Sequence, residues 1–306
     1  MNIYIALTDL TWFENLRYIQ PLEEVNFWVP GKSISLPQLQ PGELLLFKLH
    51  SPNNYIVGGG VYAHGNIFPI SLAWQAFGLN NGASTYEELR ALIERYRGYE
   101  PPNRDYEIGC VALTRPFFWP EDRWIDSHGY WKAGSRKYIK YDLSEEVGMK
   151  LWNALQIQSS GNLALAPKDE THKARHGKPH LVEPRLGQGS FRMSVADAYG
   201  RRCAVTQERV LHVLEAAHIK PYEKSGPHAI GNGVFLRSDI HRLLDSGYVT
   251  ISPNYRFEVS RRIKEDFDNG KEYQRLHGSR LYLPSRSTDY PSSEFIKWHN
   301  ENKYKG

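Results

Sequence analysis

The first half of the chain alternates short apolar runs with turn residues. The runs typical of strands, bounded by Pro, Gly and Asn turns, cover residues 3–7, 43–49, 55–62 and 107–113. Between the last two runs, residues 86–96 carry apolar side chains at helical spacing, at Leu89, Leu92, Ile93 and Tyr96. Strands around a helix, without regular βαβ alternation, predict a small curved sheet or barrel with helical insertions.

The apolar periodicity breaks at residues 155–184, a polar stretch with three prolines and two glycines. We therefore predict a linker there, between a first domain at residues 1–154 and a second domain at residues 185–306. The second domain opens with a helical pattern that ends at Gly200. Both domains mix helices with strands, so the expected fold class is α+β.

Beyond Gly200 the pattern predicts two strands and a helix. RRCAVT, at residues 201–206, is the first expected strand, and VLEAAHI, at residues 213–219, is the second. A loop rich in Gly and Pro follows. VFLRSDIHRLLDSG, at residues 234–247, then predicts a strand end and a helix that stops at Gly247. The expected order is β-β-α.

Three polar residues follow this order: His218 ends a strand, Asn232 lies late in the loop, and His241 lies on the helix. The arrangement resembles the HNH nuclease family, which has the ββα-metal fold. RLGQGSFR, RRCAVT, LEAAHIKPY and NGVFLRSDIHRLLDSG together resemble the HNH modules of bacterial restriction endonucleases, over residues 185–260. The resemblance implies metal-dependent hydrolysis of phosphodiester bonds in double-stranded DNA. Taken alone, His218 would more often be a structural histidine.

The residue types fit that chemistry. A neutral imidazole takes a proton from water at neutral pH, which makes His218 the candidate general base. His241 and Asp245 are spaced i, i+4 on the expected helix and can grip one divalent ion, which acts as Lewis acid. A mixed nitrogen and oxygen site suits Mg²⁺ or Mn²⁺, and it also accommodates Zn²⁺ or Ni²⁺. Asp245 could instead be an exposed carboxylate at the helix end.

Further residues receive supporting roles. We expect Asn232 to brace the loop, and Glu215 to be a structural or supporting carboxylate on the strand face opposite His218. The neighbouring cations are candidates for phosphate contacts, namely Lys220, Arg237 and Arg242. One departure from the family is Ala217, which occupies a position where many members have a further metal ligand. It weakens the expected metal binding without DNA and leaves open a nucleic-acid-binding protein that has lost activity.

Charge separates the two halves of the chain. Residues 1–150 hold 14 Lys and Arg against 17 Asp and Glu, whereas residues 151–306 hold 24 against 17 and nine of the twelve histidines. A basic half favours a polyanion partner, although solvated surface lysines would give the same imbalance. Two distant cysteines exclude a disulfide scaffold. The N-terminus lacks a basic signal region, and no run reaches the ~18 apolar residues of a membrane span, so we expect a cytoplasmic protein.

The first domain is rich in aromatic residues beside turn signals. PGELLLFKLHSPNNYIVGGGVYAHG resembles the PUA-like superfamily, which includes EVE, ASCH and SRA domains. That resemblance implies a pocket for a flipped, modified base, read by aromatic and polar groups. The candidate pocket residues are Phe27, Trp28, Tyr55 and Trp119. An ordinary aromatic core is the alternative for each of them.

The combined hypothesis is a restriction endonuclease that cleaves DNA containing 5-methylcytosine or 5-hydroxymethylcytosine. A nuclease that reads an unmodified sequence remains the nearest alternative. RNA as the target also stays open, because some PUA-like domains bind it. A break in both strands needs two sites, which favours a homodimer.

Overall fold

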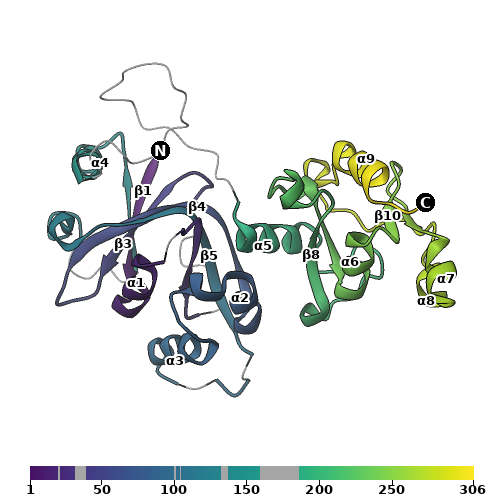
Figure 1. Cartoon of the computed structure of the whole chain (residues 1–306). Coiled ribbons are helices and arrows are strands. Elements are labelled where there is room, and N and C mark those ends of the chain that lie inside the picture. The colour runs from purple at the N-terminus through teal and green to yellow at the C-terminus, as the bar shows by residue number, and fades with distance from the viewer. Residues whose placement is uncertain (20, 32–38, 100, 104, 132–136, 159–185) are drawn as a thin grey trace. The chain divides into compact units, whose positions relative to one another are not determined.

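The computed structural model describes residues 1–306 except 20, 32–38, 100, 104, 132–136 and 159–185 (Figure 1). The chain divides into two compact units, Met1–Arg185 and Leu186–Gly306. Among the described residues, none of the helices is both long enough and apolar enough to span a membrane. Each unit is described by itself below.

Unit 1 is built on one seven-stranded mixed sheet. The strand order is β2-β5-β4-β3-β1-β7, and β6 pairs with β4. The strands are β1 (Asn2–Thr8), β2 (Glu24–Val29), β3 (Leu44–Leu49), β4 (Tyr55–Pro69), β5 (Glu107–Phe118), β6 (Ile125–Asp126) and β7 (Tyr138–Asp142). The helices are α1 (Leu10–Arg17), α2 (Ile70–Phe77), α3 (Tyr86–Arg97) and α4 (Glu146–Gln158). Only β1 and β3 run parallel among the described pairs.

The described strands form an open sheet, because no pairing joins β2 to β7. Of the two predicted forms, the closed barrel is therefore wrong for this part of the chain, and the α+β class is confirmed. The four predicted strands and the predicted helix are present as β1, β3, β4, β5 and α3. The pattern missed β2, in which all six residues are buried, the polar Glu24 and Asn26 included.

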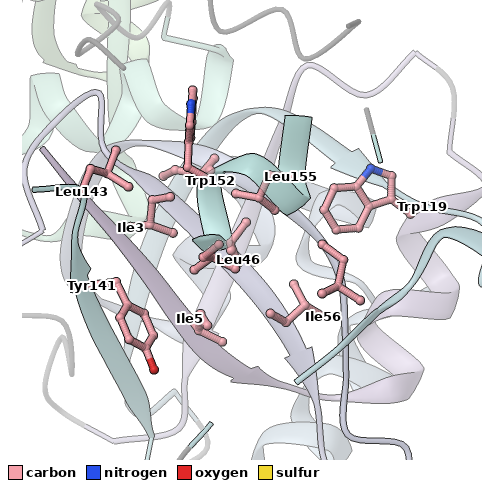
Figure 2. Close-up of a cluster of buried hydrophobic side chains, with 12 residues drawn as sticks. Ile3, Ile5, Leu46, Ile56, Trp119, Tyr141, Leu143, Trp152 and Leu155 are labelled. Carbon is pink, nitrogen blue, oxygen red and sulfur yellow. The ribbon is translucent and has the colours of Figure 1, made fainter. Parts of the chain in front are cut away.

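Helix α4 covers one face of the sheet (Figure 2). Alternate strand residues such as Ile3, Ile5 and Leu46 point towards it and pack with Leu155. Helix α4 ends only at Gln158, so it includes the first residues of the predicted linker, and Leu155 among them is fully buried. The linker boundary at 155 is therefore wrong, because this helix still has an apolar face to bury. The rest of the linker, residues 159–184, lies outside the described residues.

The opposite face of the sheet packs against α1 through aromatic rings. Trp12 lies 5.0 Å from Phe47 and 5.7 Å from Phe27, centroid to centroid, in edge-to-face geometry. Phe13 lies 5.7 Å from Phe118 in a similar edge-to-face arrangement. Edge-to-face contacts are the favoured geometry for aromatic pairs. In Figure 1, α1, α2 and α3 lie on the other side of the sheet from α4.

A glycine run in β4 allows the neighbouring strand β5 to approach closely. A Cβ atom on Gly58 would lie 2.2 Å from the carbonyl oxygen of Phe117, and one on Gly60 would lie 2.9 Å from Cβ of Leu113. Neither distance is compatible with a side chain. The register of β4 against β5 shifts between Gly59 and Val61, so the long strand bends at this point.

In unit 2, two strands and a helix follow one another along the chain. Its strands are β8 (Leu214–His218), β9 (Gly233–Arg237), β10 (Val249–Ile251) and β11 (Phe257–Val259). Its helices are α5 (Gln188–Ala198), α6 (Ser238–Asp245), α7 (Arg262–Phe267), α8 (Lys271–Gln274) and α9 (Ser293–Asn302). Strands β8 and β9 are antiparallel, with His218 opposite Gly233, and α6 follows β9 directly.

The predicted strand at residues 201–206 is wrong. These residues form turns, and the segment closes on itself because the N–H of Cys203 donates to the carbonyl of Glu208 at 2.9 Å. Gln207 in turn donates its N–H to the carbonyl of Cys203, also at 2.9 Å. The β-branched residues suggested a strand, but the local hydrogen bonds favour a turn. The ββα order therefore consists of β8, β9 and α6.

We predict that Leu155→Ala lowers the free energy of unfolding of unit 1 by about 2–5 kcal/mol, since it leaves a cavity under α4. Ile157→Ala is the matched control, because Ile157 lies on the same helix and is 76% exposed. Thermal and denaturant unfolding of the full chain measure both. Equal effects of the two substitutions would contradict the packing of α4 on the sheet.

Candidate active site

The end of β8 holds His218 against helix α5. Its imidazole stacks on the ring of Phe191, with centroids 4.0 Å apart and planes at 12°. The Nε2 atom lies 2.9 Å from Nδ1 of His228. Burial lowers the pKa of His218 to about 4, and the neighbouring His228 and His241 add to this effect. The imidazole is therefore neutral at pH 7 and able to accept a proton.

Asn232 ties the two ends of the β8–β9 connection together. Its side chain is fully buried and accepts from the N–H of Lys220 at 2.8 Å. Its amide donates to the carbonyls of Lys220 and Pro227 at 2.9 and 3.0 Å. All polar atoms of this side chain are thus used within the loop, which leaves the carboxamide bracing the backbone.

His241 on α6 lies between two carboxylates. Its Nδ1 is 2.7 Å from Oε2 of Glu215, and its Nε2 is 3.3 Å from Oδ2 of Asp245. A carboxylate can only accept, so Nδ1 carries the proton that is donated to Glu215. In the neutral ring, Nε2 then presents a lone pair to Asp245. Two acceptors at this separation repel each other unless a cation or a proton lies between them.

This pair fits a divalent cation. Ligand atoms at about 2.1 Å from an octahedral ion lie about 3 Å from each other, close to the observed separation of Nε2 and Oδ2. A metal-ligating histidine commonly donates its other N–H to a carboxylate, as His241 does to Glu215. Within the described parts of the chain, no group of three or more His, Cys, Asp or Glu side chains is placed to hold a metal. If His241 and Asp245 held such an ion, water and phosphate oxygens would have to complete the coordination.

The three candidate phosphate contacts differ in their surroundings. Arg242 is exposed on α6. The ammonium of Lys220 lies 5.8 Å from the centroid of the Trp298 ring. The guanidinium of Arg237 is paired with Asp239 at 2.6 and 3.0 Å, so a phosphate would have to compete with this carboxylate. Ala217 is fully buried and contributes no polar atom.

Unit 1 contains a cavity of about 510 Å³ on the side of the sheet that carries α1. The residues that line it come from separate strands, helices and loops: Ala6, Leu7, Thr8, Asp9, Trp12, Phe27, Trp28, Val29, Pro30, Gly31, His50, Tyr96, Arg97, Tyr99, Lys137 and Tyr138. Phe27 and Trp28, two of the predicted pocket residues, are among them. Tyr55 and Trp119 do not line this cavity. Tyr55 packs near Trp124, and Trp119 is buried in the core beneath α4.

Polar groups that sequence reasoning missed converge in this cavity. Oδ2 of Asp9 accepts from Tyr96 and Arg95, both at 2.6 Å, while Oδ1 caps helix α1. The rings of His50 and Tyr96 stack 5.7 Å apart. Burial lowers the pKa of His50, and burial together with Asp9 raises the pKa of Tyr96 to about 12, so both side chains are neutral at pH 7. For Asp9, the signal available in the sequence was its place before Leu-Thr at the start of α1, since Asp is a favoured N-cap residue.

His228 is also a residue that sequence reasoning missed. It lies between Pro227 and Ala229, in the loop that separates the candidate base from Asn232. The only available signal was a histidine at that place in a Gly- and Pro-rich loop. Its packing on the base depends on the folded loop and not on any spacing in the sequence.

Two strands, a following helix, and the placement of His218, Asn232 and His241 define the ββα-metal class of nuclease site. Residues 203–252 match the family described as HNH endonuclease. The chain therefore contains an HNH endonuclease domain, and the protein is a DNA-cleaving nuclease.

Comparison with solved structures finds a modification-dependent TagI restriction endonuclease. It is 10% identical, the alignment covers 96% of this chain and 80% of that one, and the TM-score is 0.27. A TM-score this low does not establish a shared fold. No curated protein matches the chain.

We predict that His218→Gln slows DNA cleavage by about 10²–10⁴-fold, the usual contribution of a general base. Gln retains a planar group against Phe191, whereas Ala would leave a gap at this stacking contact. Single-turnover cleavage at saturating protein measures the chemical step, and a filter-binding titration checks that DNA affinity is retained. A cleavage rate near that of the wild type would rule out His218 as the base.

We predict that His241→Ala and Asp245→Ala each raise the metal concentration needed for half-maximal cleavage, and that the double variant is little worse than either one. Ligands of a single ion act as a unit, so their effects are not additive. Glu215→Gln should weaken metal binding by about 10–100-fold, because the partner of a ligating imidazole is changed. Metal titrations of cleavage and calorimetric binding of Mn²⁺ measure these effects. Unchanged metal dependence in Asp245→Ala would remove Asp245 from the ligand set.

Proposed function

We propose that the protein is a modification-dependent restriction endonuclease that cleaves DNA containing 5-methylcytosine or 5-hydroxymethylcytosine. The observation that carries this proposal is the aromatic cavity of about 510 Å³ in unit 1, which contains none of the candidate hydrolytic residues. Its size falls within the range of about 300–1,000 Å³ that is usual for small-molecule sites. A base inside a duplex is read in such a pocket after it has been flipped out of the stack.

The groups in the cavity suit a cytosine-type base. Trp28, Tyr96 and His50 offer aromatic faces on which a base can stack. The 4-amino group of cytosine is a donor and requires an acceptor. Asp9 supplies one through Oδ1, which accepts from the N–H of Trp12 and keeps a second lone pair, whereas Oδ2 already accepts from both Tyr96 and Arg95. Neutral His50 offers one donor and one acceptor nitrogen for the other polar atoms of the base.

The hydrolytic step belongs to unit 2. In this proposal, His218 takes a proton from the attacking water, and Asn232 holds the loop in place. His241 and Asp245 hold the divalent ion, and Glu215 orients His241. When bound, Mg²⁺ or Mn²⁺, with Zn²⁺ or Ni²⁺ as alternatives, neutralises charge on the phosphoryl group and the leaving oxygen.

The cations near this site would contact the DNA backbone without reading its sequence. Lys220 and Arg242 are the proposed phosphate contacts, and Arg237 joins them only if phosphate displaces Asp239. A break in both strands requires two such sites, and a homodimer would supply them.

We predict that full-length His218→Gln protein, which binds but cuts slowly, prefers duplexes with modified cytosine over the matched unmodified duplex. Trp28→Ala should reduce this preference by about 1–3 kcal/mol, the usual contribution of stacking a base on an aromatic ring. Tyr99→Ala tests the same cavity with little risk to folding, because Tyr99 is 61% exposed. Fluorescence titrations at one fixed salt concentration with EDTA present measure the affinities.

Tyr55→Ala is the matched control, since this ring lies outside the cavity and is 40% exposed. Equal affinity for unmodified, 5-methyl and 5-hydroxymethyl duplexes would replace the modified-base hypothesis with a nuclease that reads an unmodified sequence. Tighter binding to matched RNA would make RNA the target of unit 1. Failure of the wild type to nick any duplex in Mg²⁺ or Mn²⁺ would indicate a nucleic-acid-binding protein with a weakened site.

A further inference from the structure

The loop between β8 and β9 carries a histidine that the function described above does not use. His228 places its Nδ1 2.9 Å from Nε2 of His218. The ring of Tyr222 stacks on His228 with centroids 4.4 Å apart and planes at 13°. Phe191 stacks in the same way on His218. The two imidazoles are therefore each fixed in plane by an aromatic neighbour, and they meet edge to edge at one nitrogen pair.

The backbone of the loop also holds His228 in place. The amide of Asn232 donates to the carbonyl of Pro227, the residue directly before His228. Gly226 makes a close turn there, since a Cβ atom on it would lie 1.8 Å from the carbonyl oxygen of Lys220. The position of His228 therefore depends on several independent contacts, and not on a mobile side chain alone.

A hydrogen bond between two ring nitrogens contains one proton, so only two arrangements exist for neutral rings. If His228 donates, Nε2 of His218 is the acceptor, and the proton of His218 must lie on Nδ1. Both nitrogens of His218 are then occupied, so the ring cannot take a proton from water. If His218 donates through Nε2, its Nδ1 holds the lone pair and can take a proton from water. Only the second arrangement is compatible with a general base.

We propose that His228 is the positioning residue for the general base, accepting the Nε2–H of His218 and so selecting the tautomer whose Nδ1 is basic. This inference rests on the proposed role of His218. As the water oxygen bonds to phosphorus and the bond to the 3′ oxygen breaks, the water proton moves to Nδ1 of His218. The leaving oxygen takes its proton from solvent. The imidazolium keeps its Nε2–H on His228, which holds the charged ring in place, as the third member of a hydrolase triad does.

Two substitutions separate the acceptor atom of His228 from its packing. His228→Phe keeps an aromatic ring against Tyr222 but removes the acceptor. His228→Asn places an amide oxygen near the former Nδ1 position and restores an acceptor. Tyr222→Leu is the matched control, because it removes the stack and leaves the acceptor, and Tyr222 is 57% exposed.

The first measurement is single-turnover cleavage by the full-length protein. His228→Phe should slow cleavage about 10²-fold or more, since a wrong histidine tautomer costs about 10⁴ in the serine protease triad. His228→Asn should recover most of the rate, Tyr222→Leu should stay within a few-fold of the wild type, and DNA affinity should change little in all three. A purely structural role predicts no rescue by Asn. Wild-type cleavage by His228→Phe would overturn the proposal.

The second measurement is the nitrogen NMR spectrum of the full chain with labelled histidines, assigned with His218→Gln. It needs no cleavage, so it separates this inference from the proposed function. The expected result is a proton on Nε2 of His218 in the wild type and a mixture of tautomers in His228→Phe. A proton on Nδ1 in the wild type would overturn the proposal. If His218→Gln cleaves normally, the base assignment fails even though the tautomer result stands.

Discussion

The buried carboxamide of Asn232 is the contact on which the arrangement of the nuclease site depends. It joins the backbone after β8 to the backbone of the loop before β9 through three hydrogen bonds. A buried amide that lost these partners would cost roughly 1–3 kcal/mol for each unsatisfied group. The same bonds fix both ends of the loop that presents His228 to His218. Loosening Asn232 would therefore change the geometry of the base without touching it directly.

The sequence predicted most of the nuclease module and less of its surroundings. His218, Asn232 and His241 could be named as candidates because their types and order are tied to one chemistry. The expected strand at residues 201–206 was wrong, since Cys203 and Glu208 satisfy each other across a turn. His228 was not identifiable, because its role arises only when the loop folds back on β8. Local spacing carries no information about such a contact.

The cavity of unit 1 illustrates a different limit. Phe27 and Trp28 could be singled out as aromatic residues beside a turn. Asp9, His50 and Tyr96 could not, because they come from three separate elements that the sheet brings together. Tyr55 and Trp119 had the same local signature as Trp28 but pack elsewhere. The side of the sheet that a residue faces decides its role, and strand registers must be known before that side can be assigned.

Each of the two candidate histidines of unit 2 contacts a second side chain through one ring nitrogen, but their partners differ. His241 donates one N–H to the carboxylate of Glu215, which makes its other nitrogen a stronger ligand for a cation. His218 meets the imidazole of His228 instead. A carboxylate at that place would stabilise the protonated form of His218 and raise its pKa, whereas burial beside a second imidazole lowers it. The two imidazoles thus lie in different electrostatic surroundings, although one strand, one loop and one helix hold both of them.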